Sequence, residues 1–155
     1  MPELPDIVVY IEHLKRRLIG LPLVKLEVRN PFVLRTANPP ISSIHGKRVL
    51  EMRRIGKRIV FRFDDDLFLI IHLMIAGRLR WRPQDTKPLA GKLSLAAFHF
   101  SCGILFLTEA GTKRRASIHL VVGEQSLNSF DRGGLEVLAA SLEEFSQRLR
   151  SENHT

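Results

Sequence analysis

The feature that most constrains the fold is a succession of short strand-like segments across most of the chain. In these segments apolar and polar residues alternate, or a brief apolar run stands between turn residues. Short connections such as residues 64–66 and 101–103 separate some of them, and connections of that length join antiparallel strands. The expected strands cover residues 24–28, 49–55, 58–63, 67–72, 77–81, 93–100, 104–108 and 116–122. The pattern predicts a β-rich domain: a two-sheet β-sandwich or flattened barrel of about eight mostly antiparallel strands.

A helix is expected at each end of this β-rich body. Apolar residues recur at helical spacing over residues 5–18. Pro5 suits a first helical turn, where its missing N–H leaves no bond unmade. Near the other end, Ser141 and Glu144 have the spacing of a capping box. That spacing predicts an α-helix over residues 141–152. At 155 residues, the chain is expected to form one compact domain.

The charge of the chain favours a polyanionic partner. Twenty-four Lys and Arg stand against sixteen Asp and Glu, a net charge of +8. Nucleic acid is favoured over an anionic membrane surface, although a solvated basic surface without a ligand would give the same count. The longest apolar stretch, residues 67–76, is too short to span a bilayer. The basic residues cluster at Arg16-Arg17, Lys47-Arg48, Arg53-Arg54, Lys57-Arg58 and residues 113–115.

Cysteine usage indicates the redox compartment. Cys102 is the only cysteine of the sequence, so no intrachain disulfide can form. The first residues do not resemble a secretory signal, and both observations favour a reducing, cytoplasmic setting. Cys102 lies in an apolar stretch, which predicts a buried thiol. The six histidines are scattered, so no metal site is expected.

The N-terminus carries the first candidate for covalent chemistry. Pro2 is small, and removal of Met1 would expose its secondary amine. An α-amino group titrates near pH 7.7–8.0, so a neutral, nucleophilic fraction exists at physiological pH. A Schiff base on a secondary amine is a permanent iminium cation, which acidifies the adjacent C–H and favours β-elimination. Glu3 stands beside it and could move protons. Taken alone, this start favours an ordinary N-terminus, because many chains begin Met-Pro-Glu and short motifs often mislead.

Several motifs together resemble one enzyme family. The start Met-Pro-Glu-Leu-Pro-Asp, the Arg-Arg-Ile-Gly-Lys segment at 53–57, the His-Leu-Met-Ile-Ala-Gly-Arg-Leu segment at 72–79 and the basic run at 113–115 occur in that order. This order, spacing and strand context resemble the N-terminal catalytic domain of the formamidopyrimidine-DNA glycosylase and endonuclease VIII (Fpg/Nei, MutM-like) family. The resemblance covers essentially the whole of residues 1–155.

The resemblance implies a bifunctional DNA glycosylase/AP lyase of base-excision repair. Pro2 would attack the sugar C1′ of a damaged nucleotide, Glu3 would assist ring opening and proton transfer, and Lys57 would hold a phosphate and assist elimination. The implied partner is double-stranded DNA containing oxidised bases or abasic sites, bound by a monomer in the cytoplasm of a bacterium, at the nucleoid. The implied DNA contacts are His72, Lys92, Arg114 and Arg115, with Met74 and Ile75 filling the void on the lesion side.

Three positions depart from the family pattern. Asp6 replaces a glutamate and Ile75 aligns with a methionine. Ala116 stands where the family has a phenylalanine wedge, and it cannot intercalate. The family's helix–two-turn–helix and zinc-finger domains are expected to be absent from this chain, so no cofactor is expected here and zinc only in a longer version.

These departures leave three functions open: the enzyme, a non-catalytic module that binds damaged DNA, and a domain that is inactive on its own. For His72, a phosphate contact and a packed core histidine are equally compatible with its apolar neighbours.

Overall fold

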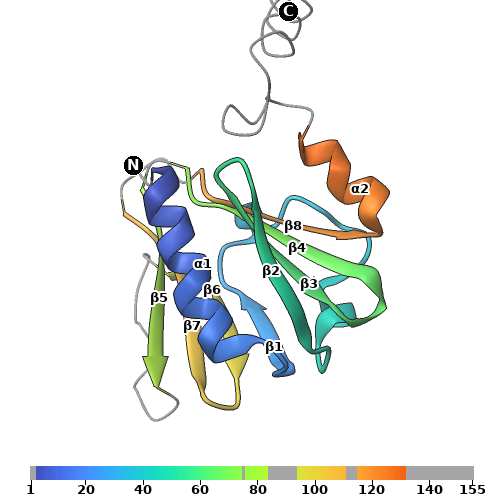
Figure 1. Cartoon of the computed structure of the whole chain (residues 1–155), viewed down its shortest axis with the longest axis horizontal. Helices are drawn as coiled ribbons and strands as arrows, with labels where there is room; N and C mark the ends of the chain where they lie inside the picture. Colours follow the sequence, from blue (N-terminus) through green and yellow to red (C-terminus); the bar gives the residue numbers. More distant parts are fainter. Residues whose placement is uncertain (1–2, 75, 84–93, 111–114, 132–155) are drawn as a thin grey trace, which may run out of the picture.

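The computed structural model describes residues 3–74, 76–83, 94–110 and 115–131. Two four-stranded sheets face each other as a β-sandwich (Figure 1). In both sheets every neighbouring pair of strands is antiparallel. The first sheet has the order β1 (Leu23–Val28), β6 (Ser94–Phe100), β7 (Gly103–Glu109), β5 (Gly77–Pro83). The second has the order β2 (Val49–Ile55), β3 (Arg58–Phe63), β4 (Leu67–His72), β8 (Ser117–Val122). The predicted sandwich is therefore confirmed, and all eight expected strands agree with the structure to within two residues at either end.

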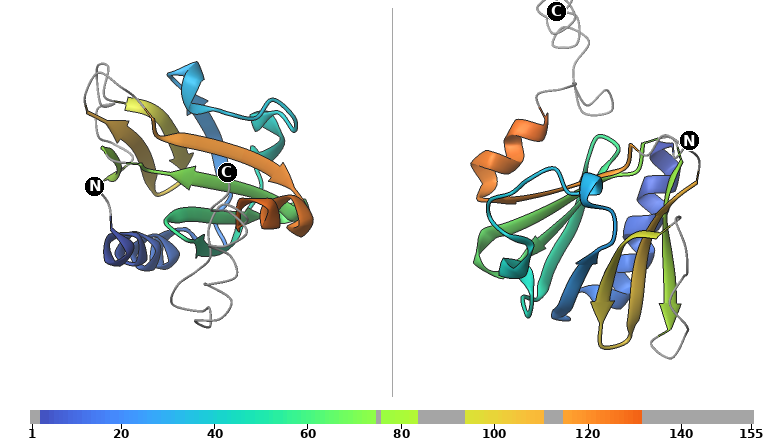
Figure 2. Two further views of the ribbon diagram at one scale, coloured as in Figure 1. Left: turned by 90° about the horizontal axis from the view of Figure 1, so that it is seen from above. Right: turned by 180° about the vertical axis from the view of Figure 1, so that it is seen from behind.

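The N-terminal helix closes one side of the sandwich. Helix α1 (Leu4–Leu18) begins one residue before the predicted helix. It packs against β2 and β3, and both Figure 1 and Figure 2 place it alongside the two sheets. Its core-facing stripe consists of Ile7, Ile11, Leu14 and Leu18, all buried. Helical spacing puts these side chains on one face, which orients the first residues of the chain relative to the sheets.

Aromatic stacking joins the two sheets. The Phe61 ring of β3 stacks on Phe98 of β6 in the opposite sheet and on Phe63 of its own strand, with ring centroids 6.2 Å apart in each case. All three rings are almost completely buried. Burial of one such side chain contributes about 1.5–3 kcal/mol, so this stack is a major source of cohesion between the layers.

The outer face of the second sheet has a small core of its own. Val60, Phe68 and Ile70 point away from the main core, and Leu127 covers them. Leu127 belongs to the short helix α2 (Glu124–Asn128), which is followed by the 3-10 turn η4 (Ser129–Asp131). This cover explains why β4 is apolar along almost its whole length. The sequence analysis did not predict α2, and the helix expected over residues 141–152 lies outside the described residues.

The connections follow the predicted pattern, with one exception. Residues 64–66 form a 3-10 turn between β3 and β4, and a two-residue turn joins β6 to β7. Cys102 lies in the β6–β7 turn and is exposed, so the prediction of a buried thiol is wrong. The apolar residues around it belong to strands, whereas the turn lies beyond the edge of the core. Within the described residues, no helix combines the length and apolarity needed to cross a membrane.

Candidate active site

The predicted site residues that the structure describes gather at one end of the sandwich. Arg58 at the start of β3 pairs with His72 at the end of β4, and His72 pairs with Ser117 at the start of β8. Antiparallel pairing thus brings the turn before β3 and the segment before β8 to the same edge as His72. The first residues of α1 lie at this end too (Figure 1). Segments far apart in sequence therefore meet here.

An ion pair joins two of the predicted catalytic residues. Lys57 Nζ lies 3.2 Å from Glu3 Oε2, a contact across 54 sequence positions. Lys57 occupies the two-residue turn between β2 and β3, where the preceding Gly56 has φ +60°. A glycine at the first position of such a turn matches the twist of the flanking strands. Both side chains remain partly exposed, 38% for Lys57 and 60% for Glu3. Exposed pairs contribute only about 0–1 kcal/mol, so Lys57 can exchange Glu3 for another anion at little cost.

Asp6 fixes the backbone at the start of α1. Its Oδ2 accepts a hydrogen bond from the backbone N–H of Glu3 at 2.8 Å. Glu3 is the residue that precedes the helix, and Asp6 is the third helical residue, so this is one half of a capping box. The carboxylate that is one methylene shorter than the family's glutamate still reaches this position. Glu3 is therefore anchored beside a helix N-terminus, whose unpaired N–H groups give positive potential.

His72 is held as a neutral hydrogen-bond donor. Its Nδ1 accepts the backbone N–H of Met74 at 3.0 Å, so in the neutral ring the proton resides on Nε2. Burial, followed by the charges of Arg58, Lys57 and His119, lowers the pKa of His72 below its ordinary value of 6.5. His72 therefore combines half-buried packing with an Nε2–H donor, and it fits both the packed histidine and the phosphate contact.

A tight turn follows His72 and presents Met74. The backbone of Met74 is left-handed, with φ +58°, and its side chain is half-buried. The turn is closed by the Gly77 N–H, which donates to the Leu73 carbonyl oxygen at 2.9 Å. A Cβ on Gly77 would collide with that same oxygen. Residue 77 therefore has to be glycine for the chain to turn back into β5 at this point.

The segment before β8 exposes one arginine and buries the residue after it. Arg115 is exposed, whereas Ala116 is only 2% exposed. The backbone N–H of Ala116 donates to both carboxylate oxygens of buried Glu109, at 3.1 and 3.3 Å. Ala116 is thus drawn into the core, which agrees with the prediction that it cannot intercalate.

Four of the predicted site residues lie outside the described part of the chain, namely Pro2, Ile75, Lys92 and Arg114. Among the described residues, no group of three or more His, Cys, Asp or Glu is placed to hold a metal ion.

Sequence reasoning did not identify Arg58 as a neighbour of His72 at this end of the sheet. It neighbours His72 in register, and its guanidinium donates to the Phe130 carbonyl oxygen at 3.4 Å. The antiparallel pairing of 58–63 with 67–72 was the signal that could have identified it.

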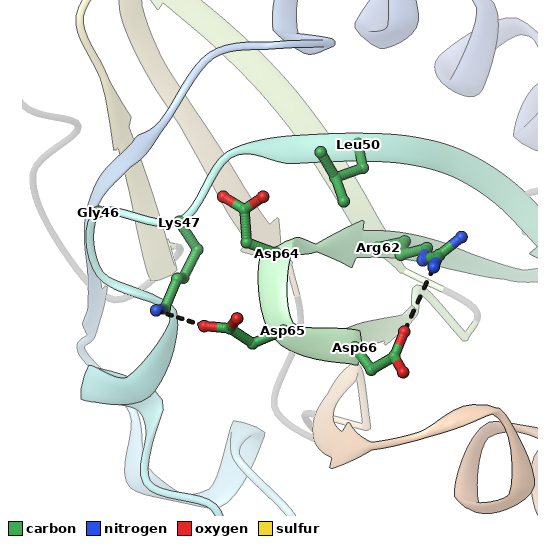
Figure 3. A pocket seen from close by; sticks show the side chains of 7 residues that line it. All are labelled: Gly46, Lys47, Leu50, Arg62, Asp64, Asp65 and Asp66. Atoms are coloured by element: carbon green, nitrogen blue, oxygen red, sulfur yellow. Dashed lines mark hydrogen bonds and ion pairs between the residues drawn. The ribbon is translucent and has the colours of Figure 1, made fainter.

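The opposite end of the second sheet contains a pocket of a different kind (Figure 3). Lys47 Nζ lies 2.6 Å from Asp65, and Arg62 lies 3.3 Å from Asp66. Hydrogen bonds from the backbone and side chain of Arg48 lower the pKa of Asp64. Each acid of this turn therefore has its own basic partner.

Comparison with known proteins identifies the family. The profile described as formamidopyrimidine-DNA glycosylase N-terminal domain matches residues 1–117. The formamidopyrimidine-DNA glycosylase of Heliobacterium modesticaldum is 29% identical over 138 residues, covering 87% of this chain and 50% of the relative. That of Methylobacillus flagellatus is 40% identical over 93 residues, covering 57% of this chain and 31% of the relative.

Solved structures agree with this assignment. The Lactococcus lactis Fpg protein, in complex with DNA containing an abasic site, superposes with a TM-score of 0.73 at 25% identity and covers 83% of this chain. A complex of MutM with DNA containing carbocyclic 8-oxo-G gives a TM-score of 0.73. The chain belongs to the formamidopyrimidine-DNA glycosylase family, whose N-terminal domain it contains. It spans about half the length, or less, of the relatives it matches.

Proposed function

We propose that this chain is the catalytic domain of a bifunctional DNA glycosylase/AP lyase that excises oxidised bases and nicks the resulting abasic site. The observation that carries the proposal is the contact between Glu3 and Lys57. A proton-transferring carboxylate and a phosphate-binding ammonium meet here, and Glu3 directly follows Pro2 in the sequence. The relatives named above are called formamidopyrimidine-DNA glycosylases, and two neighbouring structures hold DNA with an abasic site or 8-oxo-G, which supports DNA as the substrate.

The nucleophile in this proposal is the Pro2 amine after removal of Met1. Its nitrogen lone pair forms a bond to C1′ of the damaged nucleotide while the bond from C1′ to the base breaks. The base leaves with that electron pair and takes up a proton from water. Opening of the sugar ring gives a permanent iminium cation. Loss of a C2′ proton then expels the 3′ phosphate, which nicks the strand. The target base has to leave the stack first, which costs least for a damaged base.

The described residues supply the remaining steps. The Glu3 carboxylate accepts the proton that the Pro2 nitrogen loses on attack and passes it to the sugar oxygen as the ring opens. Glu3 is held in place by the hydrogen bond from its own backbone to Asp6. Lys57 leaves Glu3 to bind the phosphate that is later expelled. The neutral His72 donates from Nε2 to a neighbouring phosphate, and the exposed Arg115 adds a planar donor set suited to phosphate or base edges. A monomer acting in the bacterial cytoplasm completes the proposal.

Borohydride trapping tests this function. The chain is incubated with a duplex that contains one abasic site, and borohydride reduces any Schiff base to a stable amine. We expect a covalent protein–DNA adduct from the Met1-free chain and none from a form that retains Met1, because its Pro2 nitrogen is an amide. Absence of an adduct from verified Met1-free chain would contradict the proposal. If that chain still binds abasic DNA, it is a non-catalytic binding module instead.

A further inference from the structure

One aromatic side chain departs from the burial pattern of the other aromatic residues that the structure describes. Phe32 is 80% exposed. The other seven described phenylalanines and Trp81 are each at least partly buried. Isolated exposed apolar residues are common on protein surfaces, so exposure alone assigns nothing to Phe32. Its backbone and its location carry the inference.

The turn that presents Phe32 is firmly built. Phe32 lies in the 3-10 turn η1 (Pro31–Val33), between a proline and the buried Val33. Its backbone N–H donates to the side-chain Oδ1 of Asn30 at 3.0 Å, and its carbonyl oxygen accepts from Arg35 Nε at 2.7 Å. A ring on such a fixed backbone can engage a partner without the entropy cost of ordering a loop.

Hydrogen bonds to two strands fix both flanks of this turn. On one side, the backbone N–H of Asn30 donates to Leu95 at the start of β6, at 3.1 Å. On the other, Leu34 forms an isolated parallel bridge with Ile118, and the Arg35 N–H donates to the Ile118 carbonyl oxygen at 2.9 Å. Phe32 is thereby attached beside the first residues of β8.

That attachment places Phe32 toward the active-site end. Ile118 pairs with Ile71, the residue before His72, and Arg115 precedes β8 by two residues. In the right-hand view of Figure 2 the light-blue turn after β1 lies toward the same end of the sandwich as the β2–β3 turn that contains Lys57. A ligand broad enough to contact Lys57 and Arg115 can therefore reach Phe32 as well.

The surroundings of Phe32 suit a nucleobase better than a protein partner. Arg35 and Arg115 are both exposed. Arg35 lies three residues after Phe32 and bonds to its carbonyl oxygen, and Arg115 lies three residues before Ile118, the bridge partner of Leu34. Phe32 is the one large apolar side chain exposed in η1; the other exposed large apolar side chains of the described residues belong to other segments, namely Val8, Val9, Ile19, Val24, Leu50 and Val122. Protein interfaces are marked by contiguous apolar surface rather than by one side chain. An exposed ring among cations is the combination with which proteins stack bases and hold the adjoining phosphates. Ala116, which stands where the family has a phenylalanine wedge, offers no ring for stacking.

We propose that Phe32 stacks on a base of the DNA held at the Glu3–Lys57 end, with Arg35 binding an adjacent phosphate. This inference rests on the proposed function, because it takes damaged DNA as the ligand. Phe32 thereby contributes to the recognition of a duplex whose stacking is already interrupted, and it contributes less to the binding of intact duplex.

The test uses the full chain and two duplexes. One contains a tetrahydrofuran abasic analogue flanked by 2-aminopurine, whose fluorescence falls on stacking, and the other is undamaged. Binding is followed by anisotropy and by 2-aminopurine fluorescence for wild type, Phe32→Ala, Phe32→Leu and Phe32→Trp. Val24→Ala is the matched control, since Val24 is also exposed (55%) but lies on β1 rather than in η1.

We expect Phe32→Ala to weaken binding to the abasic analogue by about 5- to 100-fold, the usual effect of losing one stacked base. Phe32→Leu should behave like Phe32→Ala, whereas Phe32→Trp and Val24→Ala should bind and quench like wild type. The inference is overturned if Phe32→Ala binds the abasic analogue like wild type, if Phe32→Leu binds it like wild type, or if Phe32→Ala changes only the oligomeric state. The last result would indicate a protein-contact residue.

Failure of the inference and failure of the proposed function give different results. If wild type forms the borohydride adduct but Phe32→Ala binds the analogue unchanged, only the stacking role is wrong. If wild type neither forms the adduct nor prefers the analogue over undamaged duplex, the proposed function fails and the stacking role fails with it.

Discussion

Two lysine–carboxylate pairs lie at opposite ends of the second sheet and invite comparison. Lys57 pairs with Glu3 at 3.2 Å, and Lys47 pairs with Asp65 at 2.6 Å. Their exposures are similar, with 38% and 60% for the first pair and 35% and 66% for the second. Distance and exposure alone would rank the Lys47 pair as the better-formed site.

The neighbours of each pair reverse that ranking. Around Lys47, basic and acidic side chains match one to one, and Asp65 raises the pKa of Lys47 through a hydrogen bond and its charge (Figure 3). Around Lys57, the cations Arg58 and Arg115 and the neutral His72 lie at the same end as the acids Asp6 and Glu109. Asp6 accepts from the Glu3 N–H and buried Glu109 accepts from the Ala116 N–H, so among the described residues these acids bond to backbone rather than to the cations. Cations without an acidic partner attract an anionic ligand, whereas a balanced cluster only neutralises itself. The pairing of the neighbours therefore distinguishes a candidate site from a structural ion pair.

The largest difference between the two ends should appear in catalysis. Glu3→Gln should slow base release from an oxidised duplex by about 100-fold or more, because it removes the group that transfers the proton. Asp65→Asn removes the partner of Lys47 in the same way and should leave the rate unchanged. Asparagine also tolerates the left-handed backbone that Asp65 adopts, with φ +66°. Single-turnover glycosylase assays measure both, and equal rates for the two variants would contradict the comparison.

Two glycines, one at each end, should differ in how much an alanine substitution lowers the free energy of unfolding. Gly77→Ala forces a Cβ onto the Leu73 carbonyl oxygen and should lower the free energy of unfolding by about 1–3 kcal/mol, as overpacking does. At the other end, Gly46 has φ +84° but open space around it, so Gly46→Ala should cost only the backbone strain, about 1 kcal/mol. Urea denaturation measures both. Only Gly77→Ala should also weaken binding to abasic DNA, and a larger binding loss from Gly46→Ala would place the site at the wrong end.

Salt dependence separates the two lysines. Lys57→Gln should reduce the slope of log affinity against log salt concentration by about 0.9, the loss of one phosphate contact, whereas Lys47→Gln should leave the slope unchanged. Anisotropy titrations with abasic duplex over a range of NaCl concentrations give both slopes. An equal reduction from the two variants would mean that DNA covers both ends of the sheet.

The smallest expected effect concerns pH. Burial, together with nearby positive charge, lowers the pKa of folded His72, so the unfolded chain binds the proton more readily. The stabilisation is therefore fully present above the ordinary value of 6.5 and is lost as pH falls through the lowered folded value. His72→Gln should flatten the fall in unfolding free energy between about pH 7.5 and pH 5. The remaining slope comes from His99 and His119, whose pKa values are also lowered by burial. An unchanged slope in His72→Gln would contradict this assignment.

The sequence predicted the fold well because the fold is built from local patterns. Alternation and turn residues fixed all eight strands, and the helical stripe ending at Leu18 fixed α1. The sequence could not predict α2, because a helix of five residues is too short to show helical periodicity. It also misjudged Cys102, since an apolar neighbourhood in sequence became a turn beyond the edge of the core. Burial depends on where a strand ends, which local pattern does not reveal.

The site was predictable only in part. The motifs identified Glu3 and Lys57, and the structure brings them together. The capping hydrogen bond of Asp6, the neutral state of His72 and the exposure of Phe32 all depend on contacts formed by folding. Pro2, Ile75, Lys92 and Arg114 stay predictions, because they lie outside the described residues.

The central claim is that the reactive amine belongs to Pro2, the residue that precedes Glu3 in the sequence. Mass mapping of the borohydride-trapped adduct tests it most directly. The adduct is digested with protease and nuclease, and the peptide that retains the reduced sugar is identified. The account predicts the sugar remnant on the nitrogen of Pro2 in a peptide that starts at that residue. A remnant on a lysine side chain, whether Lys57 or Lys47, would contradict it.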